Sequence, residues 1–233
     1  MRLLAGTSGF AYKEWKGPFY PEDLPDKQRL AYYASRLPAV EINNTFYRMP
    51  KADLLESWAG QVPESFRFVL KASRKITHFK KLVRTEEETT YLLSTAARLG
   101  PRLGAILFQL PPKLACDLDR LATFVEALPA GTRAAFEFRH DSWFDDEVYE
   151  ILRRGNCALC LADTGEREAP RVCTADWGYL RLRRESYRPK ELESWVRWAG
   201  EQAWDEAFAF FKHEDAGAGP RLARQAIELA DGC

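Results

Sequence analysis

The sequence predicts an α/β protein built as a single (β/α)8 barrel, with parallel strands inside and helices outside. Short apolar, β-prone runs recur at steps of about 29 residues, the length of one strand-and-helix unit. These runs begin near Leu3, Val40, Phe66, Gly104, Arg133, Cys157, Gly178 and Ala207. Helical patterns separate most of the runs, and 233 residues is close to the usual size of one such barrel. We therefore expect one domain over residues 1–233.

The helices expected between the runs have recognisable ends. Pro50 and Pro189 stand where the first residue of a helix belongs. Residues 85–88 read Thr-Glu-Glu-Glu, which has the pattern of a capping box. Apolar residues keep to one helical face over 118–128. The connection after the sixth strand, residues 164–176, has no helical periodicity, so we expect an irregular loop there.

Composition excludes several classes of protein. The 34 basic residues balance 34 acidic ones, so bulk attraction to nucleic acid or an anionic membrane is not expected. Apolar stretches are too short for a signal peptide or a membrane span. The five scattered cysteines fit a reducing compartment, and we expect a cytoplasmic protein. Cys157 and Cys160 are spaced as CxxC inside a predicted strand, so they should face opposite sides as buried thiols.

Polar residues interrupt the predicted strands with a period of two. Buried parallel strands should be mostly apolar, and Val40 and Ile42 suit packing against helices. Their alternation with Glu41 and Asn43 turns these two polar residues toward the barrel interior. The same reasoning turns inward a set of residues on later strands: Lys71, Gln109, Glu137, Arg139, Arg181 and Arg183.

Most of these residues lie toward the carboxyl ends of their strands, where such barrels carry active sites. Asp163 ends the sixth strand, and the histidines His78, His140 and His213 follow strands three, five and eight. Buried charges are costly unless they are paired or open to a ligand. A salt-bridged polar plug is one interpretation. We prefer the other, a ligand-binding or catalytic cup.

Five short motifs carry a resemblance to a known family that runs in order from the first strand to the last. They are Gly6-Thr-Ser-Gly-Phe10, Val40-Glu-Ile-Asn-Asn-Thr-Phe-Tyr47, Lys71 with Ile76-Thr-His78, Leu107-Phe-Gln-Leu-Pro-Pro112, and Phe136-Glu-Phe-Arg-His140 with Trp143. Together they resemble the YecE-like proteins, a family known as domain of unknown function 72 with a TIM-barrel fold. The resemblance covers nearly the whole chain. It implies the fold and no reaction, since the family has no established one.

The resemblance loosens toward the C-terminus. Many relatives have a His-Gly after strand seven and an Asn-Asp after strand eight. This chain has Arg183-Arg184 and Phe211-Lys-His-Glu-Asp215 at those places. Asp215 is the counterpart that the resemblance implies, and we expect this part of the site to differ from the family pattern.

The leading functional hypothesis is an enzyme or binding protein for an anionic or hydroxylated small molecule. Strand-seven arginines and a Gly-containing loop at 216–220 suit a bound phosphate. Lys71 suits carbonyl binding or proton transfer, because neighbouring cations lower a lysine pKa. The candidate catalytic residues are Glu41, Lys71 and Glu137. The candidate substrate-binding residues are Asn43, Tyr47, His78, Gln109, Arg139, His140, Trp143, Asp163, Arg183, His213 and Asp215. No organic cofactor is implied, and a divalent metal is an option.

Three alternatives stay open. A glycosidase would use Glu41 and Glu137 as its carboxylate pair. Its sugar would stack on loop aromatics, namely Tyr12, Trp15, Tyr47, Trp143 and Trp177. A divalent-metal hydrolase or isomerase would draw ligands from Glu41, Glu137, Asp163, His140 and His213, although Lys71 and Arg139 would compete with the metal.

A nucleic-acid-binding barrel is the third alternative. Basic residues with interleaved aromatics run from Lys71 to Lys81, and Arg183, Arg184 and Arg188 extend them. In a chain of zero net charge, a solvated loop is the simpler interpretation. The expected partner is therefore a small molecule, anionic or sugar-like, with no membrane partner.

Overall fold

The computed structural model describes residues 1–212 and 217–232, and its strands close into one parallel barrel. The strands pair in chain order, and the last strand returns to the first. They are β1 (Arg2–Ser8), β2 (Ala39–Ile42), β3 (Arg67–Lys71), β4 (Leu103–Gln109), β5 (Ala134–Glu137), β6 (Ala158–Asp163), β7 (Trp177–Leu182) and β8 (Glu206–Phe211). Each begins within one residue of its predicted start. The predicted (β/α)8 barrel is therefore confirmed.

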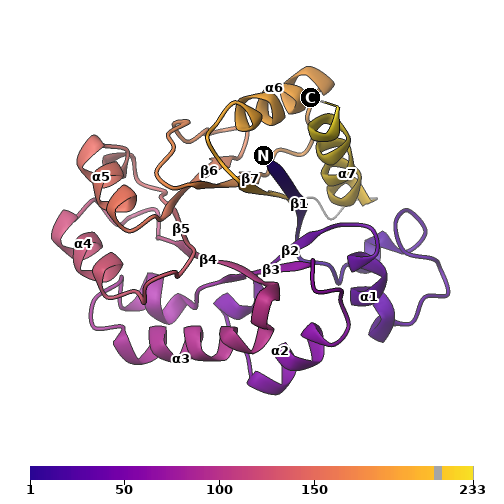
Figure 1. Ribbon diagram of the computed structural model, residues 1–233, viewed down its shortest axis with the longest axis horizontal. Coiled ribbons are helices and arrows are strands. Elements are labelled where there is room, and N and C mark those ends of the chain that lie inside the picture. Colours follow the sequence, from indigo (N-terminus) through magenta and orange to yellow (C-terminus); the bar gives the residue numbers. More distant parts are fainter. Residues whose placement is uncertain (213–216, 233) are drawn as a thin grey trace.

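Helices form a ring around the strands (Figure 1). They are α1 (Arg29–Ala34), α2 (Ala52–Ala59), α3 (Glu86–Ala96), α4 (Leu118–Glu126), α5 (Asp146–Arg154), α6 (Pro189–Gly200) and α7 (Ala218–Asp231). Residues 164–176, between β6 and β7, contain no helix, as predicted. In the part of the chain that the structure describes, no helix is long and apolar enough to cross a membrane.

The observed helix ends agree only in part with those predicted from the sequence. Pro189 is the first residue of α6, as predicted, but Pro50 precedes α2 by two positions, so that prediction is wrong. The helix α3 starts directly after Thr85, yet the Thr85 side chain makes no capping hydrogen bond. The predicted capping box is absent because the Glu88 carboxylate accepts a hydrogen bond from Lys80 Nζ at 2.7 Å instead.

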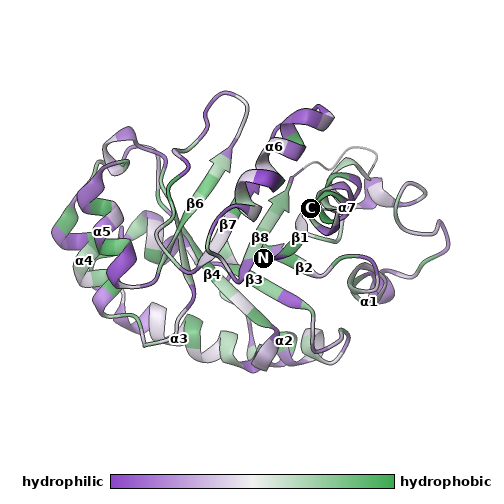
Figure 2. Ribbon diagram, turned by 45° about the horizontal axis from the view of Figure 1, so that its top comes forward, coloured by the Kyte–Doolittle hydropathy of each residue, from purple (hydrophilic) through white to green (hydrophobic). Residues whose placement is uncertain are grey.

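Successive side chains of each strand point to opposite faces of the barrel wall, and this alternation produces two separate hydrophobic cores. Val40 and Phe68 pack in the outer core, between strands and helices, whereas Val69 and its inward-facing neighbours fill the barrel. Cys157 lies in the outer core and Cys160 in the inner one, so the CxxC pair faces opposite sides as predicted. In Figure 2, β6 and β8 carry the hydrophobic colour along most of their length. Charged residues within such strands must therefore find partners inside the barrel.

Two glycines allow close packing in the barrel. A Cβ on Gly6 would lie 1.9 Å from the carbonyl oxygen of Ala39, so only glycine lets β1 approach β2 at this point. A Cβ on Gly104 would lie 2.9 Å from Cζ of Phe208, a residue of β8. The ring of Phe208 thus reaches across the interior to β4.

Candidate functional site

A buried arginine joins two buried glutamates inside the barrel. Arg181 of β7 donates from Nη2 to Glu41 Oε1 at 2.8 Å and from Nη1 to Glu137 Oε2. Glu41 belongs to β2 and Glu137 ends β5, so one guanidinium links three separate strands. All three side chains are almost completely buried. Charges removed from water in this way are stable only when each is paired.

Donors occupy both oxygens of the Glu41 carboxylate. Oε1 accepts from Ser8 Oγ at 2.7 Å and from Asn43 Nδ2 at 3.0 Å, and Oε2 accepts from the Tyr179 hydroxyl at 2.7 Å. Burial alone would raise the pKa of Glu41. The charge of Arg181 and these hydrogen bonds outweigh it and hold the pKa below its usual range.

Glu137 is held in the same manner by a second arginine. Its Oε1 accepts from Arg139 Nε at 2.8 Å and Nη2 at 2.6 Å. Burial opposes ionisation, but the charges of Arg181 and Arg139 lower the pKa of Glu137 to about 2. Both glutamates are thus ionised and occupied by donors. We conclude that Glu41 and Glu137 act as fixed counter-ions, an arrangement that does not support the acid and nucleophile roles of a glycosidase.

Lys71 stands beside this network at the end of β3. Its Nζ donates to Gln109 Oε1 at 2.7 Å and lies 4.4 Å from the centre of the Phe46 ring. Burial and then the positive charge of Arg181 lower the pKa of Lys71 to about 8, although the charges of Glu137 and Glu41 oppose the shift. A substantial share of Lys71 is therefore a neutral amine near pH 8, as a nucleophile or base requires.

Cations outnumber carboxylates among the inward-facing polar residues that the structure describes at this end of the barrel. We use the name mouth cluster for a set of residues on the inward face of the strand ends: Glu41, Asn43, Lys71, Gln109, Glu137, Arg139, Arg181 and Arg183. Four of its side chains are cationic and two are anionic, which leaves an excess of two positive charges. Burial and the charge of Arg181 lower the pKa of Arg183, and burial and the charge of Lys71 lower that of His78. In both groups burial is the larger cause, and neighbouring positive charge adds to it.

Two of the predicted residues reach the rim of the mouth cluster. Phe46 packs against the Tyr47 ring at 5.0 Å and the His78 ring at 4.9 Å, and the same Phe46 lies under Lys71. Tyr47 is 67% exposed. The predictions for His213 and Asp215 concern residues outside the described part of the chain.

Asp163 ends β6, as predicted, but its side chain does not join the mouth cluster. Cys160 lies in the inner core, three positions before Asp163, and the alternation therefore turns Asp163 outward. Its carboxylate accepts from Arg184 Nε at 2.8 Å and from the Tyr187 hydroxyl at 3.2 Å. Asp163 thus anchors the segment that follows β7.

The structure places Trp143 in the outer core and His140 at the start of a short turn. Trp143 is fully buried, stacks on Phe138 at 4.7 Å and donates from Nε1 to the Leu114 carbonyl at 2.7 Å. His140 Nδ1 lies 2.8 Å from Ser142 Oγ and caps the short turn that begins at residue 141. Because Glu137 and Arg139 face inward, the alternating Phe138 and His140 face outward. Trp15 and Trp177 are buried as well and have no surface for a sugar.

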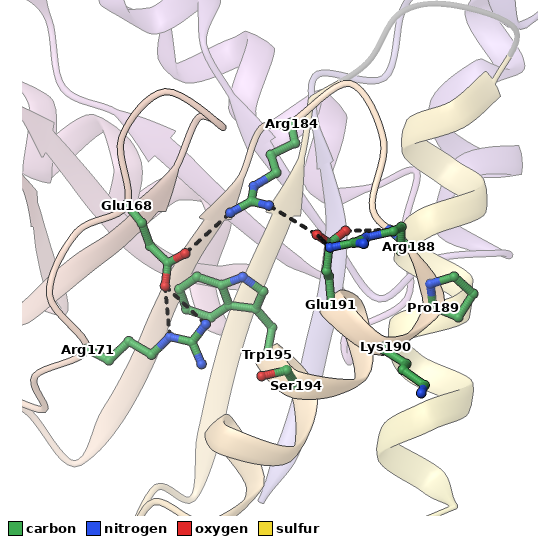
Figure 3. A pocket seen from close by; sticks show the side chains of 9 residues that line it. All are labelled: Glu168, Arg171, Arg184, Arg188, Pro189, Lys190, Glu191, Ser194 and Trp195. Atoms are coloured by element: carbon green, nitrogen blue, oxygen red, sulfur yellow. Dashed lines mark hydrogen bonds and ion pairs between the residues drawn. The ribbon is translucent and has the colours of Figure 1, made fainter.

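Arg184 belongs to a second polar region, on the β6–β7 side of the barrel (Figure 3). A cavity of ≈ 690 Å³ lies there, at the start of α6. Arg184 contacts Glu168 at 3.4 Å and Glu191 at 3.5 Å, and Arg171 lies 3.7 Å above the Trp195 ring. The arginines are already matched by carboxylates. The region therefore serves to fasten the irregular connection to α6.

The metal alternative finds little support in the donors that the structure describes. Across residues 1–212 and 217–232, no three His, Cys, Asp or Glu side chains gather as a metal-binding group. The oxygens of Glu41 and Glu137 already accept from arginines and hydroxyls. A cation would have to displace these donors.

Three residues of the site escaped the sequence analysis. Tyr179 follows the same inward alternation as Arg181 on β7, so a complete reading of that strand would have found it. Ser8 is the last residue of β1 and lies in the Gly-Thr-Ser-Gly motif. Phe46 had no periodic signal, because it lies in the short turn Asn44–Phe46 after β2.

Comparison with known proteins places the chain among relatives of similar length. A family model described as "Protein of unknown function DUF72" matches residues 4–232. The UPF0759 protein YunF of Bacillus subtilis (strain 168) is 24% identical over 254 residues, which covers 91% of this chain and 90% of YunF. The UPF0759 protein YecE of Escherichia coli (strain K12) is 32% identical over 128 residues, or 54% of this chain and 47% of YecE.

A solved structure shows the same fold. The crystal structure of a DUF72 family protein from Thermotoga maritima MSB8 superposes with a TM-score of 0.79 at 25% identity. The superposition covers 100% of this chain and 99% of that protein. The likeness extends over the complete barrel.

Proposed function

The chain belongs to the DUF72 family of proteins of unknown function. From the charges of its mouth cluster we propose that the protein binds and transforms a small anionic molecule. The observation that carries this proposal is the excess of two positive charges among the described residues of the mouth cluster. Both carboxylates there are already occupied. Positive charge within reach of solvent attracts an anion of matching charge.

The part of the mouth cluster open to a ligand is mainly cationic. The Arg139 side chain is 32% exposed, and Lys71 and Arg183 are half-buried. Guanidinium groups bind carboxylate or phosphate through paired hydrogen bonds. Glu137 holds Arg139 in place, so little side-chain freedom is lost when a ligand arrives.

Lys71 is the group that we assign to chemistry. Its amine is neutral in part near pH 8, and it stands between a hydrogen-bond acceptor and an aromatic ring. Such an amine adds to the carbonyl carbon of an oxo-acid or sugar phosphate, and loss of water leaves an imine. The arginines would bind the anionic end of the same molecule.

Ligand-dependent stability tests the binding step. We expect inorganic phosphate and malonate to raise the melting temperature of the protein, whereas glucose leaves it unchanged. Arg139→Gln should remove most of the shift. Arg153→Gln, an exposed arginine on α5, is the matched control and should retain it. Equal shifts with the neutral sugar would contradict an anion site.

Reductive trapping tests the role of Lys71. The protein is incubated with glyoxylate or dihydroxyacetone phosphate and borohydride, and the adduct is mapped by mass spectrometry. We expect one adduct on Lys71, with a yield that rises as the pH passes through about 8, because only the neutral amine adds to a carbonyl. Lys71→Met should abolish it and Lys75→Met should not. Labelling spread over surface lysines would refute the assignment.

A further inference from the structure

An unusual surface follows β3, outside the mouth cluster. Residues 74–84 contain five basic and no acidic side chains. Two aromatic rings stand at its edges, Phe79 at 66% and Tyr47 at 67% exposed. We use the name basic rim for its exposed cationic and aromatic members other than Lys80, which is paired with Glu88: Tyr47, Arg74, Lys75, Phe79, Lys81 and Arg84.

The two rings of the basic rim surround one cation. The Arg74 guanidinium lies 5.8 Å from the centre of the Tyr47 ring and 5.3 Å from that of Phe79. Aromatic rings of this size usually bury most of their surface. Here both rings lie next to the same cation and remain open to solvent.

The backbone of this segment is held in uncommon conformations. Lys75–Phe79 is a π-helical turn, and Lys81, Leu82 and Arg84 all have positive φ angles. Non-glycine residues in that region carry strain, and both features concentrate at functional sites. The buried side chain of Leu82 anchors the turn while those of Lys81 and Arg84 stay exposed.

A chain of ring contacts connects the basic rim with the mouth cluster. Phe46 lies under Lys71 at 4.4 Å and against Tyr47 at 5.0 Å, and Tyr47 in turn contacts Arg74. A ligand lying on the rim would therefore pass beside the mouth. The rim itself shares no residue with the mouth cluster.

We propose that the basic rim binds single-stranded nucleic acid. Unpaired bases expose the π faces that stack on aromatic platforms, and phosphates pair with the surrounding lysines and arginines. A duplex hides these faces, and an anion without rings would leave Tyr47 and Phe79 unused. This inference goes beyond the proposed small-molecule function and does not depend on it.

Fluorescence anisotropy with a labelled oligothymidylate of about 15 nucleotides tests the proposal, since such a length spans a typical single-strand site. We expect saturable binding that weakens as salt rises. A duplex of equal length should bind more weakly. Phe79→Leu should weaken oligonucleotide binding about tenfold and leave inorganic polyphosphate binding unchanged. Tyr91→Leu, an exposed tyrosine on α3, is its control.

A charge-neutralising pair completes the test. The double variant Lys75→Gln with Lys81→Gln should weaken both oligonucleotide and polyphosphate binding. The double variant Arg221→Gln with Arg224→Gln, on the exposed side of α7, should change neither. Lys71→Met should retain oligonucleotide binding, which separates this inference from the mouth cluster. Failure to bind, equal affinity for the duplex, or an unaffected Phe79→Leu variant would each overturn it.

Discussion

At the scale of single residues, Arg181 decides whether the polar interior is stable. It is the cation shared by Glu41 and Glu137, and all three lie out of contact with water. Removing one member of such a group leaves the other charges buried and unmatched. The stability of the barrel and the charge of the mouth therefore depend on the same side chain.

We expect Arg181→Met to lower the free energy of unfolding by about 3–5 kcal/mol, because it leaves two carboxylates without their shared partner. Guanidinium denaturation measures this. Arg153→Met is the control: its ion pair with Glu150 is exposed, and such pairs contribute less than about 1 kcal/mol. Equal losses in the two variants would show that the buried bridge has no special role.

The low pKa of Glu137 predicts how the stability of the protein changes in acid. Its pKa in the folded state is about 2, below the ordinary value of 4.5, so folding favours the ionised form. The resulting stabilisation is present above about pH 5 and is lost as the pH falls toward 2. It corresponds to about 3 kcal/mol. Urea titrations between these pH values should show this loss in the native protein and a smaller one in Glu137→Gln.

Glu191 is a useful comparison for that measurement. Hydrogen bonds from Arg188 lower its pKa to about 2 as well, but Glu191 lies near the surface. Salt screens exposed charges and reaches buried ones poorly. The effect of Glu191→Gln on acid stability should therefore vanish in high salt, whereas that of Glu137→Gln should persist. The opposite pattern would contradict the burial of the Glu137 pair.

At the scale of elements, the two-residue alternation predicted the direction of side chains well inside the strands and poorly at their ends. Glu41, Lys71 and Arg139 face inward as predicted, because the pleat of a strand leaves no other choice. Asp163 shows where this prediction fails. Its position at the end of a strand suggested a place at the mouth, but the alternation of side chains along β6 directs its carboxylate outward. Trp143 lies in a turn, where no periodicity constrains the direction of a side chain.

The strained segment after β3 yields a prediction of its own. Lys81 has a φ angle of 52° and an exposed side chain, so Lys81→Gly should raise the free energy of unfolding by about 0.5 kcal/mol. Asn156 also has positive φ, at 48°, but its side chain bonds to Asp176. Asn156→Gly should therefore destabilise. Thermal melts of both variants decide this, and a destabilised Lys81→Gly would argue against strain.

At the scale of the whole molecule, the barrel interior packs as one unit. Gly104→Ala would bring a new Cβ to 2.9 Å from the Phe208 ring, and we expect a loss of about 1–3 kcal/mol. Phe208→Leu makes room, so the double variant should be more stable than the sum of the two single changes. A coupling of about 1 kcal/mol in a double-mutant cycle is expected. Additive effects would mean that the two strands pack independently.

The overall architecture was predictable because each strand-and-helix unit repeats one hydrophobic pattern. The partners of the charged residues could not be predicted from the sequence. Glu41 and Arg181 are separated by 140 positions, and only closure of the barrel brings them together. Local patterns carry no information about such contacts, and the choice between a plug and a cup depended on them. The salt-bridged plug describes the two glutamates, whereas the ligand-binding cup stays a prediction that rests on Lys71 and Arg139.

The Arg181 bridge also acts as a partition across the barrel. Apolar side chains fill the space on one side of it, and the groups that meet solvent stand on the other. Residues above the partition can then be exchanged without disturbing those below. A library randomised at Lys71, Gln109 and Arg183, with Glu41, Asn43, Glu137 and Arg181 kept, would make the barrel a scaffold whose specificity can be evolved apart from its folding.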